Sequence, residues 1–301
     1  MAGTPVTVAD GVHAYVQEPG GWCVNNAGIV VGEEAVLVVD TAATEKRALA
    51  LRRAVDGLAG GRRRILVSTH HHGDHTFGNH VFTGRGTLLI SHEAGPAELV
   101  RKGTALQSMW PHVDWGDTPT VLPALTVRGG ATLNLGGTVA ELIHPGVAHT
   151  SDDLAVWLPE QRVLFAGDLV FSGAAPFVLM GSLAGSLAAL ARLRALDPLV
   201  VVGGHGPVGG PELIASTEEY LRWTAALAER GLADGLDPLR TALRADEGVF
   251  AALLDRERLV GNLHRAFHEA AGGVPGARIE SAPAMREMVV FNGGRPLHCA
   301  A

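Results

Sequence analysis

The segment that most constrains this chain is Thr69–His75, which reads Thr-His-His-His-Gly-Asp-His. It directly follows Ile65–Ser68, a largely apolar run of the kind that forms a buried strand. Imidazole and carboxylate groups are common ligands of zinc and iron in proteins. The pattern within the segment, His70-x-His72-x-Asp74-His75, offers enough ligands for two ions and therefore predicts a two-metal site at the end of a strand.

Three further polar residues lie in the same kind of setting, at the end of an apolar run. His149 follows the strand predicted over 138–143, Asp168 follows the one over 163–166, and His205 follows the one over 199–202. Glycine precedes Asp168 and His205, and it allows the backbone to turn sharply and approach a metal closely. We expect these residues to complete the ligand set. The alternatives are His144 in place of His149, and ordinary turn or loop roles for Asp168 and His205.

Composition bounds the class of protein. The 301 residues are 47% hydrophobic and 18% charged, which is typical of a globular protein, and the formal net charge is -7. A phosphate backbone favours a basic partner, so nucleic acid is not expected to bind. No apolar run reaches the roughly 20 residues of a membrane span, and no secretory signal is visible. With only Cys23 and Cys299 as cysteines, the chain suits a reducing cytoplasm.

The first half of the chain predicts α/β layering. Two strands, 28–31 and 35–39, are joined by a turn at 32–34, and Thr44 is expected to cap a helix that runs to Ala59. Gly60 and Gly61 end that helix, and the strand that carries the histidines follows. Strand, helix and strand in this order are the usual sign of helices layered on a sheet.

The rest of the chain divides into three parts. Residues 91–123 are irregular and rich in large amphipathic side chains, so they are a candidate pocket wall or lid. A second block of strands and a helix over 182–196 follow. After Pro211 the pattern is helical, which predicts a body at 1–210 and a helical extension at 211–301 packed on it.

The ordered set that starts at His70 and ends at His205 resembles the pattern of the metallo-β-lactamase superfamily over residues 10–210, and Asp40 fits its structural aspartate. The resemblance implies an αββα sandwich with metals at one edge between two sheets. It implies that the first metal is held by His70, His72 and His149, the second by Asp74, His75 and His205, with Asp168 bridging them. Zinc is the default, although such sites also accept iron and manganese.

Asp168 points to one branch of that superfamily. It is similar to the glyoxalase II, lactonase and thioesterase branch, whereas zinc β-lactamases have a cysteine or no bridging aspartate here. Antibiotic hydrolysis is therefore disfavoured. The flavodiiron relatives would want a glutamate in place of His72, which argues against oxygen reduction. His71 is expected to point away from the metals, because side chains alternate along an extended segment.

Segments outside the metal motifs resemble the cyclase–thioesterases of type II aromatic polyketide pathways, of the actinorhodin type. They are Glu18–Gly28, Trp110–Gly116, Val156–Pro159, Gly203–Pro207 and Phe291–Gly294. The resemblance implies an enzyme that closes a later ring by aldol condensation and releases the product from an acyl carrier protein by thioester hydrolysis. The alternatives are a plain thioester or lactone hydrolase, and a metal-binding protein without catalysis.

The resemblance also assigns further residues. Asp74 would be catalytic as well as a ligand, since it can orient a water or accept its proton. A flat, bulky substrate needs a wide pocket with apolar walls, for which the candidates are Trp22, Phe77, Trp110, Trp115, Phe171, Phe177 and Met180.

An acidic carrier protein is expected to dock on basic residues near the mouth of the site. Arg62–Arg64 begin the strand that ends at the histidines, so they lie at the opposite end from the metals. Arg85, Arg101 and Lys102 are the better candidates. The sequence leaves the oligomeric state open.

Overall fold

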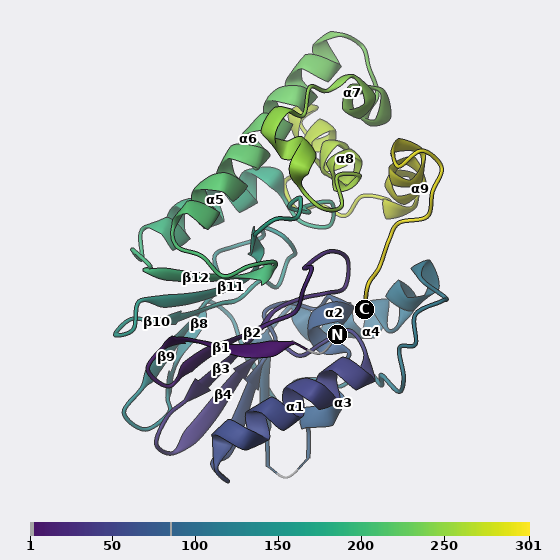
Figure 1. The fold of residues 1–301 in the computed structure, drawn as a ribbon. Coiled ribbons are helices and arrows are strands. Elements are labelled where there is room, and N and C mark those ends of the chain that lie inside the picture. Colours follow the sequence, from purple (N-terminus) through teal and green to yellow (C-terminus); the bar gives the residue numbers. More distant parts are fainter. Residues whose placement is uncertain (1–2, 85) are drawn as a thin grey trace.

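The computed structural model describes residues 3–84 and 86–301, so Arg85 lies outside the described residues. It shows two sheets that face each other between two layers of helices, as predicted for an αββα sandwich (Figure 1). The first sheet has seven strands in chain order: β1 (Thr4–Ala9), β2 (Val12–Val16), β3 (Ala27–Val31), β4 (Ala35–Val39), β5 (Arg63–Val67), β6 (Leu88–His92) and β7 (Leu125–Val127).

The second sheet has five strands in the order β12 (Val200–His205), β11 (Val163–Phe171), β10 (Ala155–Leu158), β9 (Val139–Ile143) and β8 (Gly130–Asn134). The pairs β4–β5, β5–β6, β6–β7 and β11–β12 are parallel, and the remaining pairs are antiparallel. Parallel neighbours end at the same edge of a sheet, so the chain segments that follow β4, β5 and β11 or end β12 gather at one edge of the sandwich.

The helices form the two outer layers. Those of the first half are α1 (Glu45–Ala59), α2 (Gly73–Thr76), α3 (Asn79–Phe82), α4 (Gly95–Lys102) and the 3₁₀ turn η1 (Ala105–Met109). Those of the second half are α5 (Leu183–Arg194), α6 (Glu212–Ala233), α7 (Pro238–Arg244), the 3₁₀ turn η2 (Gly248–Ala252), α8 (Arg258–Ala270) and α9 (Ser281–Phe291). The sequence predicts α1, α5 and the helical character of the chain after Pro211, but it does not predict α2, α3 or α4.

Helix α1 forms where the sequence predicts it. Thr44 has extended backbone dihedrals, and its side chain accepts a hydrogen bond from the backbone N–H of Arg47. Gly60 ends the helix with a φ of 56°, a left-handed conformation that favours glycine. The buried face of the helix includes Leu51 and Val55, which pack on the first sheet. The N-cap, the C-cap and the apolar face thus all support a helix over the same residues.

Buried aliphatic side chains fill the space between the sheets. Leu37 and Val67 come from the first sheet, and Val156, Phe165 and Val202 come from the second. These five side chains are at most 2% exposed. Burial of apolar area at roughly 25 cal/mol per Å² makes this layer a main source of stability, and it fixes the sheet edge that carries the histidines.

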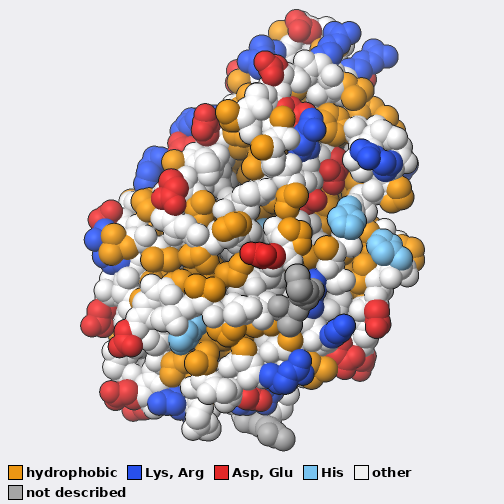
Figure 2. Space-filling model, in the orientation of Figure 1, with side chains coloured by type: hydrophobic (Ala, Val, Ile, Leu, Met, Phe, Trp, Pro, Cys, Tyr) orange, Lys and Arg blue, Asp and Glu red, His pale blue; other side chains and the backbone are white. Residues whose placement is uncertain are grey.

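The surface shows no single-sign electrostatic patch on the face in Figure 2, where acidic and basic side chains are interspersed. A basic stripe of the kind that binds nucleic acid is therefore missing from that face. Within residues 3–84 and 86–301, no helix combines the length and the apolar character that crossing a membrane requires.

Candidate metal centre

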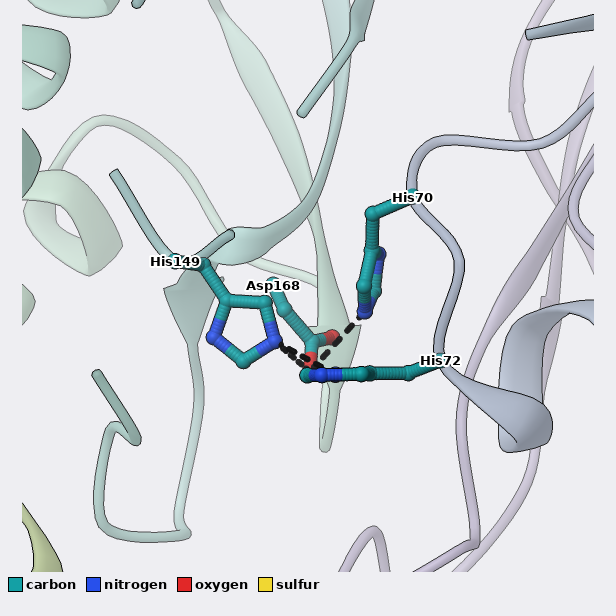
Figure 3. A group of neighbouring side chains, drawn as sticks. All are labelled: His70, His72, His149 and Asp168. Carbon is teal, nitrogen blue, oxygen red and sulfur yellow. Dashed lines mark hydrogen bonds and ion pairs between the residues drawn. The ribbon is translucent and has the colours of Figure 1, made fainter. Parts of the chain in front are cut away.

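Two groups of possible ligands lie at the edge of the sandwich, on the loops and strand ends named above. The first group consists of His70, His72, His149 and Asp168 (Figure 3), and the second consists of Asp74, His75 and His205. Within each group the ligand atoms lie within 4.8 Å of one another. All of the predicted ligands therefore come together, divided between two groups as the resemblance implies.

Asp168 faces both groups with different oxygens. Its Oδ2 lies 3.4 Å from Nε2 of His149 and 3.9 Å from Nε2 of His70. Its Oδ1 lies 3.1 Å from Nε2 of His75 and 3.5 Å from Nε2 of His205. One carboxylate oxygen is thus directed to each group, which is the arrangement of a bridging ligand.

The backbone brings this carboxylate close by means of glycine. The sequence places Asp168 after a strand, but β11 continues through it to Phe171, with a shift in register at Gly167. Gly167 has a φ of 53°. A Cβ on Gly204 of the neighbouring β12 would lie 1.9 Å from Oδ1 of Asp168. The carboxylate therefore occupies space that only glycine leaves free.

Hydrogen bonds at Nδ1 fix the orientation of three of the rings. Nδ1 of His75 donates to Oδ2 of Asp40 at 2.8 Å. Nδ1 of His149 donates to the carbonyl oxygen of Phe177 at 2.5 Å, and Nδ1 of His205 donates to that of Val24 at 3.1 Å. Each bond leaves the Nε2 lone pair of the neutral ring directed at the centre, as a metal ligand requires.

The donor atoms fit divalent cations. Nε2 of His70 and His75 and Oδ1 of Asp168 are buried and have no hydrogen-bond partner among the described residues. Nδ1 of His72 and Nε2 of His149 face each other at 2.9 Å, and each nitrogen can direct a lone pair into the space between the rings. Buried polar atoms without partners are costly, and a cation between them would satisfy them.

The electrostatics separate the two groups. Burial, together with neighbouring histidines, lowers the pKa of His70 and His72 well below the usual value, so both rings are neutral. Burial alone would also lower the pKa of His205, but the carboxylates of Asp168 and Asp74 outweigh it and raise that pKa to about 9. The carboxylates thus favour positive charge at the second group, which a divalent cation would supply when the rings are neutral.

A cavity of about 430 Å³ opens directly onto both groups. Several predicted wall residues line it, namely Trp22, Phe77, Phe171, Phe177 and Met180. Trp110 and Trp115 do not line it, which corrects the prediction for them. The indole N–H of Trp110 donates to the carbonyl oxygen of Leu297 at 2.8 Å, and that of Trp115 donates to Trp110 at 3.3 Å. Both rings are buried in the core beside the cavity.

His71 belongs to neither ligand group, as expected, but its ring does line the cavity. Residues 69–71 form a bend before α2, so the side-chain alternation of an extended strand does not apply to them. The ring is buried, and its Nδ1 lies 2.6 Å from Oδ1 of Asp152.

The sequence gives no signal for the cavity residues that come from the helical extension. Arg258 begins α8, and Met285 and Arg286 lie on α9. The guanidinium of Arg258 lies 4.1 Å from the centre of the Trp22 ring, and Glu257 accepts the Trp22 indole N–H at 2.7 Å. The segment predicted as a pocket wall does contribute, through Leu106 and Met109 among others.

Residues 20–205 match the sequence model of the metallo-beta-lactamase superfamily. The chain belongs to this superfamily. It is 28% identical to the "Metallo-beta-lactamase type 2" of Bacillus sp. (strain 170) over 221 residues, which span 70% of this chain and 78% of that protein. It is also 28% identical to the "Hydroxyacylglutathione hydrolase" of Methylococcus capsulatus over 138 residues, 46% of this chain and 45% of that protein.

The solved structure of a metallo-beta-lactamase from Pontibacter korlensis shares the fold, with a TM-score of 0.62 at 22% identity, and the match covers 73% of this chain and 98% of that one. The chain is thus a metal-binding hydrolase of the metallo-beta-lactamase superfamily. The helices after β12 lie beyond the residues that the family match covers.

Proposed function

We propose that this hydrolase is a cyclase–thioesterase, which closes a later ring of an aromatic polyketide by aldol condensation and releases the product from an acyl carrier protein. The observation that carries the proposal is the cavity, whose aromatic and thioether walls meet both ligand groups directly. A flat, largely apolar acyl chain fits such walls, because aromatic rings and methionine pack well against aromatic substrates.

The site has the groups that both steps need. Two divalent cations, zinc by default, would act as Lewis acids on a carbonyl oxygen and would lower the pKa of water. Asp74 lines the cavity, and its Oδ2 lies 3.4 Å from Nε2 of His205. The carboxylate can hold a water against the thioester carbonyl and accept its proton. The apolar rings of Phe177 and Trp22 restrict the access of bulk water to the acyl chain.

A plain thioester or lactone hydrolase is the second candidate. The hydroxyacylglutathione hydrolase among the relatives supports it, since its name describes thioester cleavage. The bridging position of Asp168 supports both candidates over a β-lactamase, because the resemblance stated above associates a bridging aspartate with the thioesterase branch.

The two candidates differ in their products from a bicyclic polyketide thioester of N-acetylcysteamine. Metal-loaded protein is incubated with this substrate, and the products are separated and identified by mass spectrometry. The proposal expects a cyclised, dehydrated acid, and Asp74→Asn abolishes its formation. Uncyclised acid alone would identify the plain hydrolase. Faster turnover of a penicillin than of any thioester or lactone would contradict both candidates.

A further inference from the structure

Beyond the metal ligands, the charged side chains that line the cavity all have the same sign. Lys102 comes from α4, Arg258 from α8 and Arg286 from α9. The only carboxylates among the described lining residues are Asp74 and Asp168, which belong to the metal groups. In a chain of net charge -7, three cations around one apolar cavity call for an anionic ligand.

No acidic side chain of the described residues forms an ion pair with Lys102. Its ammonium is half-buried, and its polar contact is the thioether sulfur of Met180, at 3.4 Å. Glu98, one turn earlier on α4, is engaged by Arg101 and Arg278 instead. Within the described part of the chain, Lys102 makes no ion pair. An ammonium that is partly removed from water without a partner is poorly satisfied, and burial accordingly lowers its pKa.

Arg286 lines the same cavity from α9. It is exposed, and no ion pair or hydrogen bond joins it to any residue within 3–84 or 86–301. The neighbouring Glu287 pairs with His264 at 2.7 Å. Arg258 differs, because Asp255 lies 2.9 Å away and the carbonyl oxygen of Ala175 accepts from it at 2.9 Å. The lining cations without an ion pair among the described residues are therefore Lys102 and Arg286.

We propose that Lys102 and Arg286 form an anion subsite that binds a negatively charged group of the thioester substrate. The group is either a phosphate of the arm that carries the thioester or a carboxylate on the acyl chain. The inference rests on the proposed thioester hydrolysis and extends it to substrate charge. It also gives the helical extension a role, because α4 alone supplies only one of the two cations.

Four thioesters of one aromatic acyl chain separate the two sources of charge. The chain is prepared with and without a terminal carboxylate, and each form is attached to N-acetylcysteamine or to coenzyme A, which carries phosphates. KM and kcat are measured for the wild type, for Lys102→Met/Arg286→Met and for Arg128→Met. Arg128 is an exposed arginine that pairs with Glu93 and does not line the cavity, so it is the control.

The inference expects the double variant to raise KM about tenfold for one class of charged substrate, as the loss of two partly exposed ion pairs would. The KM of the uncharged thioester, kcat and the Arg128→Met values remain at the wild-type level. Lys102→Arg/Arg286→Lys restores the low KM. Equal KM values for all four thioesters in wild type and double variant would overturn the subsite but leave hydrolysis established.

A direct measurement keeps the subsite testable if hydrolysis itself is absent. Failure of the wild type to cleave any of the four thioesters contradicts the proposed function. Calorimetric titration of the metal-loaded protein with coenzyme A and with the free aromatic dicarboxylate then measures anion binding alone. Binding that the double variant loses supports the subsite, and the same affinity in both proteins, or none, overturns it.

Discussion

The carboxylate of Asp40 holds both ends of the histidine segment. Its Oδ2 accepts the Nδ1–H of His75 at 2.8 Å and the hydroxyl of Thr69 at 2.7 Å, while its Oδ1 accepts the backbone N–H of Thr69 at 2.7 Å. A single side chain at the end of β4 therefore sets the start of the segment and the ring of a ligand six residues later. This is the structural role that the sequence predicts for Asp40.

Replacing Asp40 with Asn tests that role. Asp40 has a φ of 63°, a conformation that Asn also tolerates, so the backbone is preserved. The amide nitrogen replaces an acceptor with a donor opposite His75 or Thr69. We expect the affinity of the second group for metal to fall about tenfold to a hundredfold, as is usual when a ligand loses its supporting carboxylate. Metal content after dialysis against a weak chelator measures the change.

Asp56→Asn is the control for this substitution. Asp56 is exposed and pairs with two arginines, Arg52 and Arg64. Its replacement should leave the metal content unchanged. Equal metal content in Asp40→Asn and wild type would show that Asp40 does not position His75.

Gly204→Ala tests how tightly the bridging carboxylate is packed. The new Cβ would lie 1.9 Å from Oδ1 of Asp168 and 2.9 Å from its backbone nitrogen, so the carboxylate would have to leave its place between the two groups. We expect loss of metal from both groups, together with a destabilisation of about 1–3 kcal/mol or more from overpacking. Metal analysis and thermal unfolding measure the two effects.

Gly57→Ala provides the matched comparison. Gly57 lies within α1, and an added Cβ there meets nothing within 4 Å. Alanine is the better helix former, so this variant should be as stable as the wild type or up to about 1 kcal/mol more stable. Wild-type metal content in Gly204→Ala would contradict the assigned packing.

Local patterns in the sequence are enough to predict the metal ligands and the αββα sandwich. The ligands lie within or after apolar runs that form strands, and parallel strands place their ends together. Thr44 and Gly60 mark the ends of α1 by the same local chemistry. These features depend on neighbours a few residues away, so the sequence predicts them directly.

The walls of the cavity depend on contacts between distant residues. Trp22 meets Glu257 across 235 positions, and Trp110 meets Leu297 across 187. Whether a tryptophan faces a cavity or the core is decided by such partners, and no local pattern distinguishes Trp22 from Trp110. The same reason explains why the sequence does not predict the contribution of Arg258.

Arg258→Met should destabilise the protein. Its side chain is 2% exposed, with Asp255 at 2.9 Å, the Ala175 carbonyl at 2.9 Å and the Trp22 ring at 4.1 Å. Methionine fills part of the volume but leaves the carboxylate without its partner. We expect a loss of about 3 kcal/mol in the free energy of unfolding, as for other broken buried ion pairs. Chemical denaturation of the metal-loaded protein measures it.

Two further variants show whether the buried pair is the cause. Arg256→Met removes a neighbouring arginine whose side chain is 45% exposed and pairs with Glu247, and it should cost less than about 1 kcal/mol. Adding Asp255→Asn to Arg258→Met should recover part of the loss, because the two residues are coupled. Equal losses in Arg256→Met and Arg258→Met would contradict this explanation.

Asp168 and Asp74 should differ in how many metals their replacement affects. Asp168 directs one oxygen to each group, whereas Asp74 lies only in the second, with Oδ2 3.4 Å from Nε2 of His205. Asp74→Asn should therefore retain metal in the first group and lose hydrolysis. Asp168→Asn should weaken both groups by more than the tenfold to hundredfold that follows loss of a supporting residue. Titration of metal-free protein with zinc resolves the two binding steps, and a normal first step in Asp168→Asn would show that this carboxylate does not bridge.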